Sequence, residues 1–364
     1  MPGSGYVAKS YATTGNIEAR HYNTLVWGSN VGGALVTTTN NLNLLWGPGY
    51  GAKGINQSMI SVTGLPSNAG SGTGYNDNVG TLTPVAGYFT SQNSNNQTGT
   101  ADIVTSQQWI GFVSALNKLL YHQNASSGNI ATAPGHGSTV TPIVSYDTYL
   151  AAASSNMGKA RSPGPITIPN SSQTYSWSAT GAQNDSGSIQ LSILWADGNQ
   201  ARWFFNAGGY VVFSVKGKNT LTNVRSIDTA AIFTEIGSIN MYGTSSTGGT
   251  AGQTNGGKGY WNMGPTLAGV AYHNASAGVY TGSFAQVSMC VQNHSGVGSE
   301  SGAVGCEIVF QISATSAVAG TFGAVDNLGV EIDVTVQLWD PTGFNASPIV
   351  KTWSDPTITN LTVV

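Results

Sequence analysis

Carboxylates are the first candidates for chemistry in this chain, because a pair of Asp or Glu residues can cleave a glycosidic bond. Glu331 and Asp333 alternate along a predicted strand, so both side chains lie on one face of it. Solvated strand acids have the same spacing, and several other acids fall in predicted turns, where Asp bonds its own backbone. We therefore predict no catalytic residue and keep a polysaccharide depolymerase only as an alternative. The acids weighed were Asp185, Asp197, Asp228, Glu235, Glu300, Glu307, Asp326, Glu331, Asp333 and Asp340.

Histidines and serines give no further catalytic or metal-binding pattern. No histidine stands in a Cys/His pattern with the spacing of a zinc site. The two on or next to predicted helices, His21 and His122, are expected to pack or to cap helix ends. No Gly-x-Ser-x-Gly turn sits between a strand and a helix, as a nucleophilic serine would require. We predict no metal and no cofactor. The remaining histidines are His136, His273 and His294.

Aromatic residues offer the best candidates for binding, since their faces pack against the C–H faces of sugar rings. Tyr260 and Trp261 follow a Gly-rich loop and are the candidate glycan contacts, with core packing as an equal alternative. For Trp203–Phe205 and for Trp339 we favour the core.

The two cysteines, Cys290 and Cys306, flank a Gly/Ser-rich stretch and could face each other across a hairpin. A disulfide is one interpretation. Two free core thiols are the favoured one, because proteins made in a reducing cytosol keep their thiols.

Charged residues make up only 7% of the 364 residues, and Gly, Ser, Thr, Asn and Gln carry the polarity instead. This is far below the roughly 25% of an average soluble domain and suits a fixed place in an assembly. The net charge of −3, without a basic stripe, disfavours nucleic-acid binding. No apolar run approaches the roughly 20 residues of a membrane span, and the N-terminus lacks the pattern of a secretory signal. We expect the protein to fold in the cytosol of the cell that makes it.

Two segments have helical periodicity before a marked boundary. One runs from Asn16 to Val26, and a clearer one begins at Thr105 with the apolar stripe Trp109, Phe112, Val113, Leu116, Leu119 and Leu120. Their similar spacing has two explanations, an internal repeat or two helices of like register. A short helix is expected at Ser145–Met157. The Pro/Gly-rich stretch Arg161–Pro165 predicts a domain boundary.

Beyond that boundary the pattern becomes that of short strands rich in β-branched and aromatic residues. We expect one helix among them, Ile227–Ile236. The fold class is therefore mainly β: a small α+β N-terminal docking or oligomerisation module (1–160), an antiparallel β-sandwich or jelly-roll-like domain (165–355) and a C-terminal tail (356–364). The tail is either an edge strand or an arm that reaches a neighbour. Predicted strands are Tyr175–Trp177, Ser188–Trp195, Ala201–Phe205, Tyr210–Lys216, Gln286–Gln292, Glu307–Ser313 and Val330–Trp339.

Four short patches carry a resemblance to a known family. They are Ile17–Leu25 (aliphatic-x-Ala-x-x-aromatic-Asn-x-Leu), the Gly-rich Gly47–Gln57, the helix end His122-Gln123, and the Phe-Phe-Asn-x-Gly-Gly turn at Phe204–Gly209. In these patches the chain resembles virion structural proteins of tailed bacteriophages, particularly cyanophages. It departs from their pattern at Trp109-Ile110-Gly111, where the family prefers Trp-Asn.

The resemblance implies a non-enzymatic component of the virion, of tail-fibre or tail/neck-appendage type, that takes part in assembly and in host attachment. Its expected partners are other virion proteins, two further copies in a homotrimer, and a host surface glycan, without nucleic acid or membrane insertion. The alternatives are a capsid or tail decoration protein, and a carbohydrate-binding receptor-recognition protein or depolymerase.

Overall fold

The computed structural model of the chain is mainly β in the part that it describes, with 49% of those residues in strands and 22% in helices. The described chain forms two compact units. Unit 1 comprises residues 1–163, 202–208 and 341–353, and unit 2 comprises residues 164–201, 209–340 and 354–364. Each unit is thus built from three separate stretches of chain, whereas the sequence analysis expects continuous domains. The described residues are 29–31, 34–36, 106–123, 143–156, 160, 163–180, 184–243, 245–249, 258–260, 262–274, 280–292, 305–318, 325–341 and 353–363.

Unit 1 contains the antiparallel pair β1 (Ser29–Val31) and β2 (Ala34–Val36) and the helices α4 (Ser106–Gln123) and α5 (Ile143–Ser155). The predicted stripe of α4 is confirmed where its side chains are described, because Trp109, Phe112, Val113, Leu116 and Leu120 are buried. The two helices predicted between residues 100 and 160 are both present. The helix expected at Asn16–Val26 lies outside the described residues.

An aromatic cluster joins the two helices of unit 1. The ring of Trp109 meets that of Tyr146 edge-on, with centroids 5.4 Å apart, and Phe112 lies 5.5 Å from both. Edge-to-face pairs of this kind add to the free energy of burial. The cluster fixes α5 against the apolar stripe of α4.

The prediction of a strand at Ala201–Phe205 is wrong, because this segment belongs to helix α6 (Gly198–Asn206). Asp197 caps this helix, since its Oδ1 accepts a hydrogen bond from Gln200 N at 3.0 Å. Gly208 ends the turn after it with a φ of 96°, a conformation that favours glycine. The β propensity of adjacent aromatic residues was misleading, because a cap before them and a glycine after them define a helix.

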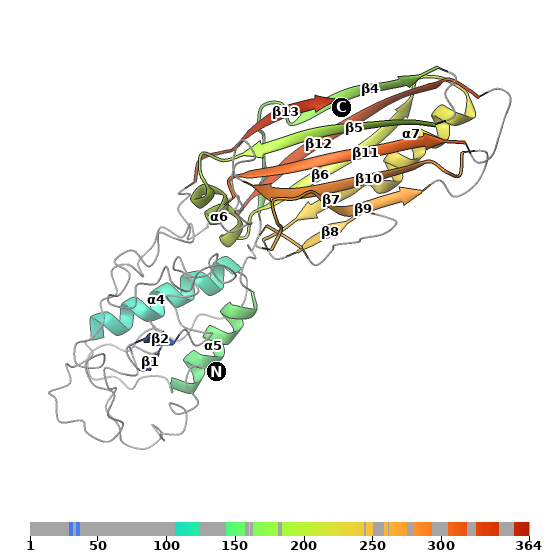
Figure 1. Cartoon of the computed structure of the whole chain (residues 1–364). Helices are drawn as coiled ribbons and strands as arrows, with labels where there is room; N and C mark the ends of the chain where they lie inside the picture. The colour runs from blue at the N-terminus through green and yellow to red at the C-terminus, as the bar shows by residue number, and fades with distance from the viewer. Residues whose placement is uncertain are drawn as a thin grey trace. The chain divides into compact units, whose positions relative to one another are not determined.

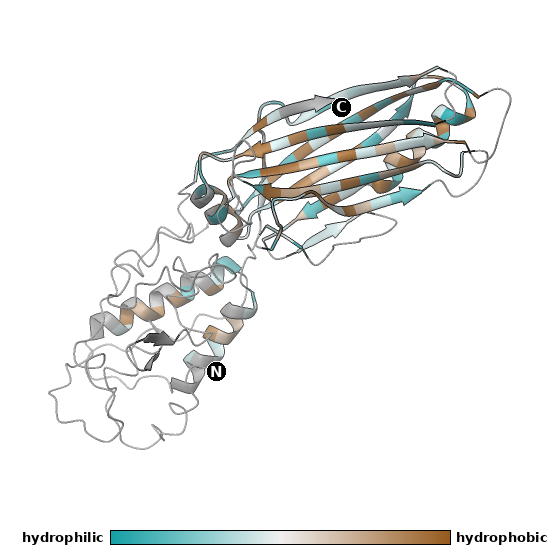
Figure 2. Ribbon diagram, in the orientation of Figure 1, coloured by the Kyte–Doolittle hydropathy of each residue, from teal (hydrophilic) through white to brown (hydrophobic). Residues whose placement is uncertain are grey.

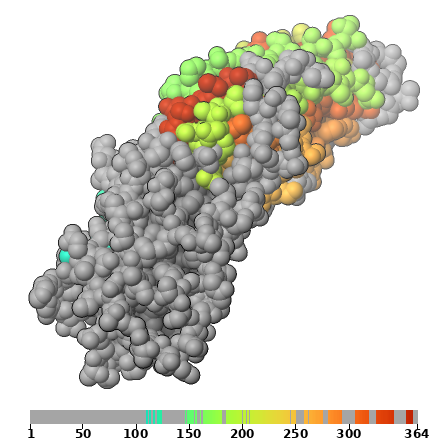
Figure 3. All heavy atoms as spheres, turned by 60° about the vertical axis from the view of Figure 1, so that its left-hand side comes forward, coloured from blue at the N-terminus to red at the C-terminus, as the bar shows by residue number. Residues whose placement is uncertain are grey.

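Unit 2 is an antiparallel β-sandwich (Figure 1). The first sheet has the order β3-β12-β6-β7-β8, with β4 also paired to β12, and the second has the order β13-β5-β11-β10-β9. Strands distant in sequence become neighbours, and Figure 3 shows green and red residues side by side on one face. The first sheet contains β3 (Gly164–Ile166), β4 (Ser172–Ala179), β6 (Tyr210–Asn219), β7 (Ser238–Met241), β8 (Ser246–Gly248) and β12 (Leu328–Asp340). The second contains β5 (Asn184–Leu194), β9 (Ala268–Asn274), β10 (Phe284–Gln292), β11 (Glu307–Ala317) and β13 (Thr357–Val363).

The core of the sandwich lies between the two sheets. Along β12 every second residue from Leu328 to Leu338 is buried, and apolar and polar residues alternate along the strands in Figure 2. Phe213 of the first sheet stacks on Phe310 of the second, with ring centroids 4.5 Å apart. Every predicted strand outside Ala201–Phe205 falls in this sandwich. The C-terminal tail is an edge strand, since β13 pairs with β5.

Helix α7 (Val224–Ile236) contacts strands of both sheets, namely β6, β12, β9 and β10. Asn223 caps it by accepting a hydrogen bond from Ser226 N at 2.9 Å. The predicted helix Ile227–Ile236 is confirmed, and begins three residues earlier. Its buried face includes Phe233 and Ile236, so α7 completes the core on one side of the sandwich.

The first turn of α7 also contains a buried cationic side chain. Arg225 is fully buried and donates from Nε to Ser316 Oγ (2.9 Å), from Nη1 to Asp326 O (3.0 Å) and from Nη2 to Ser316 O (3.3 Å). The guanidinium fork thereby ties α7 to the end of β11 and to the segment before β12.

Replacing Arg225 with methionine should lower the free energy of unfolding of the sandwich by about 2 kcal/mol. The lost charge-assisted hydrogen bonds leave carbonyl acceptors buried, while removal of a buried cation offsets part of that cost. Urea unfolding, followed by the strand signal in circular dichroism, measures the change. A loss below about 0.5 kcal/mol, the range of ordinary surface substitutions, would show that the network contributes little.

Candidate functional site

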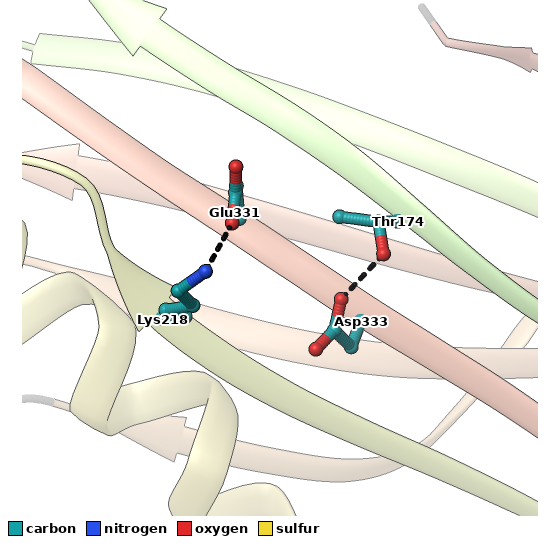
Figure 4. Close-up of polar contacts among 4 residues, drawn as sticks. All are labelled: Thr174, Lys218, Glu331 and Asp333. Atoms are coloured by element: carbon teal, nitrogen blue, oxygen red, sulfur yellow. Dashed lines mark hydrogen bonds and ion pairs between the residues drawn. The ribbon is translucent and has the colours of Figure 1, made fainter.

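The paired acids of β12 lie on the outer face of the first sheet (Figure 4). Glu331 Oε2 lies 3.0 Å from Lys218 Nζ, and Asp333 Oδ1 accepts a hydrogen bond from Thr174 Oγ1 at 2.6 Å. Asp333 also stands opposite Lys216 in the strand register. The prediction that both acids share one face is confirmed. Each has a cross-strand partner, as expected of acids that stabilise an exposed sheet face.

Tyr260 is fully buried, and its hydroxyl donates to Gly305 O at 2.8 Å. A ring without exposed surface offers no face to a sugar, so the structure corrects the candidate glycan contact at this position in favour of core packing. Trp261 lies outside the described residues.

Trp339 faces outward from the first sheet, which contradicts its assignment to the core. It stacks on Tyr210 with centroids 5.4 Å apart and planes within 9°, and Tyr210 lies 4.9 Å from the ring of Tyr242. Burial, and then the neighbouring Tyr242, raise the pKa of Tyr210. Because the rings stack on one another, they form a cross-strand ladder that holds β12, β6 and the end of β7 together. Of the other aromatic core predictions, Phe204 and Phe205 are confirmed as buried, and the Trp203 side chain lies outside the described residues.

The described histidines contact neighbouring groups of the fold, and the two cysteines are not bonded to each other. His122 is buried at the end of α4, with Nε2 bonded to Ala207 O at 2.7 Å, as the packing interpretation predicts. His273 of β9 contacts Glu235 of α7. Both thiols are free, and burial, with Glu307 as a lesser cause, raises the pKa of Cys290 to about 11. Among the described residues no three His, Cys, Asp or Glu side chains gather in a way that could hold a metal ion. His21, His136, His294 and Glu300 lie outside those residues.

A small cavity opens where the edges of the two sheets face each other, between β4 and β5. It has a volume of about 40 Å³ and an apolar lining that includes Trp177, Gly187, Ile189, Phe233 and Ile332. A hydrogen bond of 2.7 Å from Trp177 Nε1 to Asp185 Oδ2 links the two strands beside it. Sequence reasoning missed this place, because its lining comes from β4, β5, α7, β11 and β12.

Filling the corner of this cavity should stabilise the sandwich, and Gly187→Ala is the variant that does so. The new methyl group would lie 3.6 Å from the Trp177 indole, an ordinary contact. Alanine also restricts the unfolded chain more than glycine, and together these effects should add about 0.5–1 kcal/mol. A lower melting temperature than that of the wild type would contradict this prediction.

The outer face of the second sheet carries uncharged polar side chains in cross-strand rows. Gln286, Ser313 and Ser188 form one row, which Tyr272 continues on β9. In the next row Phe284 stands beside Thr315, and Thr315 and Ser186 face each other with their hydroxyl oxygens 2.9 Å apart. Rows of this kind keep a sheet wet without repelling a neighbouring protein surface.

The comparisons with known proteins add no relative. No protein-family model, no curated protein and no solved structure matches the chain. Among the described helices, none is long and apolar enough to cross a membrane. The class that fold and surface define is an antiparallel β-sandwich protein with a second, partly helical unit.

Proposed function

We propose that this chain is a non-enzymatic structural component of a bacteriophage virion, a tail fibre or a tail or neck appendage. The observation that carries the proposal is the outer face of the second sheet, where the cross-strand rows through Ser313 and Thr315 contain no charged residue. A surface of this kind lies flat against a neighbour without the desolvation of charges that such a contact otherwise requires.

The composition of the whole chain supports the same function. With 7% charged residues, the protein lacks the mutual repulsion that keeps cytosolic proteins apart at high concentration. The patches at Ile17–Leu25, Gly47–Gln57, His122-Gln123 and Phe204–Gly209 that resemble tailed-phage structural proteins add independent support. Of these, Phe204–Asn206 closes a helix instead of forming a strand turn.

The proposed partners are other virion proteins and two further copies of this chain. The homotrimer is what the resemblance to phage fibres implies, and a native mass of three times 37.4 kDa is then expected for the purified protein. Host attachment through a surface glycan belongs to the same proposal, with its contact residues outside the buried Tyr260.

Electron cryomicroscopy of purified phage particles tests the proposal, at a resolution that allows this sequence to be traced. Density for the chain in a tail or neck appendage is the expected result. A regular layer of copies on the capsid or the tail tube would replace the appendage with the decoration role. Particles that lack the chain would overturn the virion proposal.

A further inference from the structure

Two amide side chains on the outer face of the first sheet form no hydrogen bond with the residues that the structure describes. They belong to Gln337 of β12, which is exposed, and to Asn240 of β7, which is half-buried. Both stand in one cross-strand row, with Val212 of β6 between them. Because the row takes two strand spacings from one amide to the other, they lie about 10 Å apart. Each amide offers one acceptor oxygen and two N–H donors to a ligand.

The aromatic ladder forms the next row of the same face. Trp339 follows Gln337 by two residues on β12 and therefore points to the same side of the sheet. Tyr242 follows Asn240 by two residues in the same way. The rings of Trp339, Tyr210 and Tyr242 are all half-buried, and the ring of Tyr242 meets no described ring other than that of Tyr210. Its second ring face can therefore take a ligand. We call these five residues the amide-aromatic face.

The outward-facing residues of β12 and β6 carry no net charge. The row after the two amides contains hydroxyl groups, from Thr335, Ser214 and Ser238, and the last two are bonded to each other at 2.7 Å. Beyond that row two acids of β12 stand opposite two lysines of β6, and Figure 4 shows one of these pairs, Glu331 with Lys218. Because these charges balance one another, the outer face attracts neither anions nor cations, and an uncharged ligand suits it best.

We propose that the amide-aromatic face binds an uncharged polysaccharide. Its aromatic rings contact the C–H groups of the sugars, and its amides bond their hydroxyls in both directions, as donor and as acceptor. Because the two amides lie further apart than one sugar ring spans, the ligand is a chain of sugars. A protein surface would cover the amides without a partner at most positions, which is costly, whereas a glycan has hydroxyls along its whole length. The inference rests on host attachment in the proposed function and names its contact residues.

A microarray of uncharged and anionic glycans, probed with the labelled full chain, tests the inference. We expect binding to uncharged glycans, and about tenfold weaker binding to them for Gln337→Ala and for Asn240→Ala, since each variant loses hydrogen bonds to the ligand. Gln286→Ala is the matched control, because it removes the same side chain beside an aromatic residue, Tyr272, on the outer face of the second sheet. Its binding should equal that of the wild type.

Tyr242→Leu tests the aromatic part, because leucine keeps apolar packing against Tyr210 and removes the ring face. It should also weaken binding about tenfold, with a circular dichroism spectrum like that of the wild type. A wild type that binds no glycan, or only anionic ones, overturns the inference, as does unchanged binding in the folded variants. In those cases the virion proposal stands if the particles contain the chain. Glycan binding by a chain that the particles lack would instead leave this site in place and remove the virion role.

Discussion

Replacing Gly217 with alanine should destabilise the sandwich by about 3 kcal/mol. A methyl group at this position of β6 would lie 2.2 Å from the backbone carbonyl oxygen of Ala230 in α7, and 2.8 Å from its Cα. The neighbour is backbone, so no side chain can rotate away and the whole helix must shift. Overpacking of this kind costs typically 1–3 kcal/mol. The shift would also strain the hydrogen bonds by which Thr234 Oγ1 bridges Gly217 N and Gly217 O, each at 3.2 Å.

Gly187→Ala is the matched control, since it is the same substitution in a strand of the other sheet, with ordinary contact distances. Urea unfolding of the two variants, followed by the strand signal in circular dichroism, should give midpoints on opposite sides of the wild type. Equal midpoints would mean that α7 does not pack closely on β6, and with it the account of how the helix completes the core would fail.

The main features of the fold could be predicted from local pattern. The apolar stripe of α4, the helical stretch ending at Ile236 and the strands around Val334 and Ile312 follow from periodicity alone. Strand propensity predicts the wrong element at Phe204 and Phe205, because it takes no account of the helix cap at Asp197.

The candidate site was less predictable, because it depends on which strands become neighbours. The sequence pattern predicts a core position for Trp339, whereas its stacking on Tyr210 places it on the outer face of the sheet. The pattern places Tyr260 after a Gly-rich loop and does not indicate that its side chain is buried. The cavity beside Gly187 exists only because β4, β5, α7, β11 and β12 come together. The close approach at Gly217 has the same origin. Propensity and spacing describe one element at a time, whereas edges, cavities and close contacts belong to pairs of elements.

Unit 1 should lose about 2–3 kcal/mol of stability when the pH falls from 7 to 4.5, through His122 alone. Burial lowers the pKa of His122 from 6.5 to about 4, although the bond to Ala207 O acts in the opposite direction. Between these values the unfolded chain binds a proton that the folded chain does not. Stability therefore rises with pH in this window and is lost as the pH falls through it, at about 1.4 kcal/mol per pH unit.

The variant His122→Gln isolates this effect from the carboxylates that titrate in the same range. Its amide can still donate to Ala207 O, but it cannot bind a proton, so the difference in unfolding free energy between wild type and variant should itself depend on pH. Urea unfolding of both at pH 7 and pH 4.5, followed by the helix signal of α4 and α5 in circular dichroism, measures that difference. At pH 7 the wild type should be the more stable, and at pH 4.5 its advantage should shrink by about 2–3 kcal/mol or reverse. A constant difference would mean that His122 is solvated, and that the helix end at Gln123 is more open than its burial indicates.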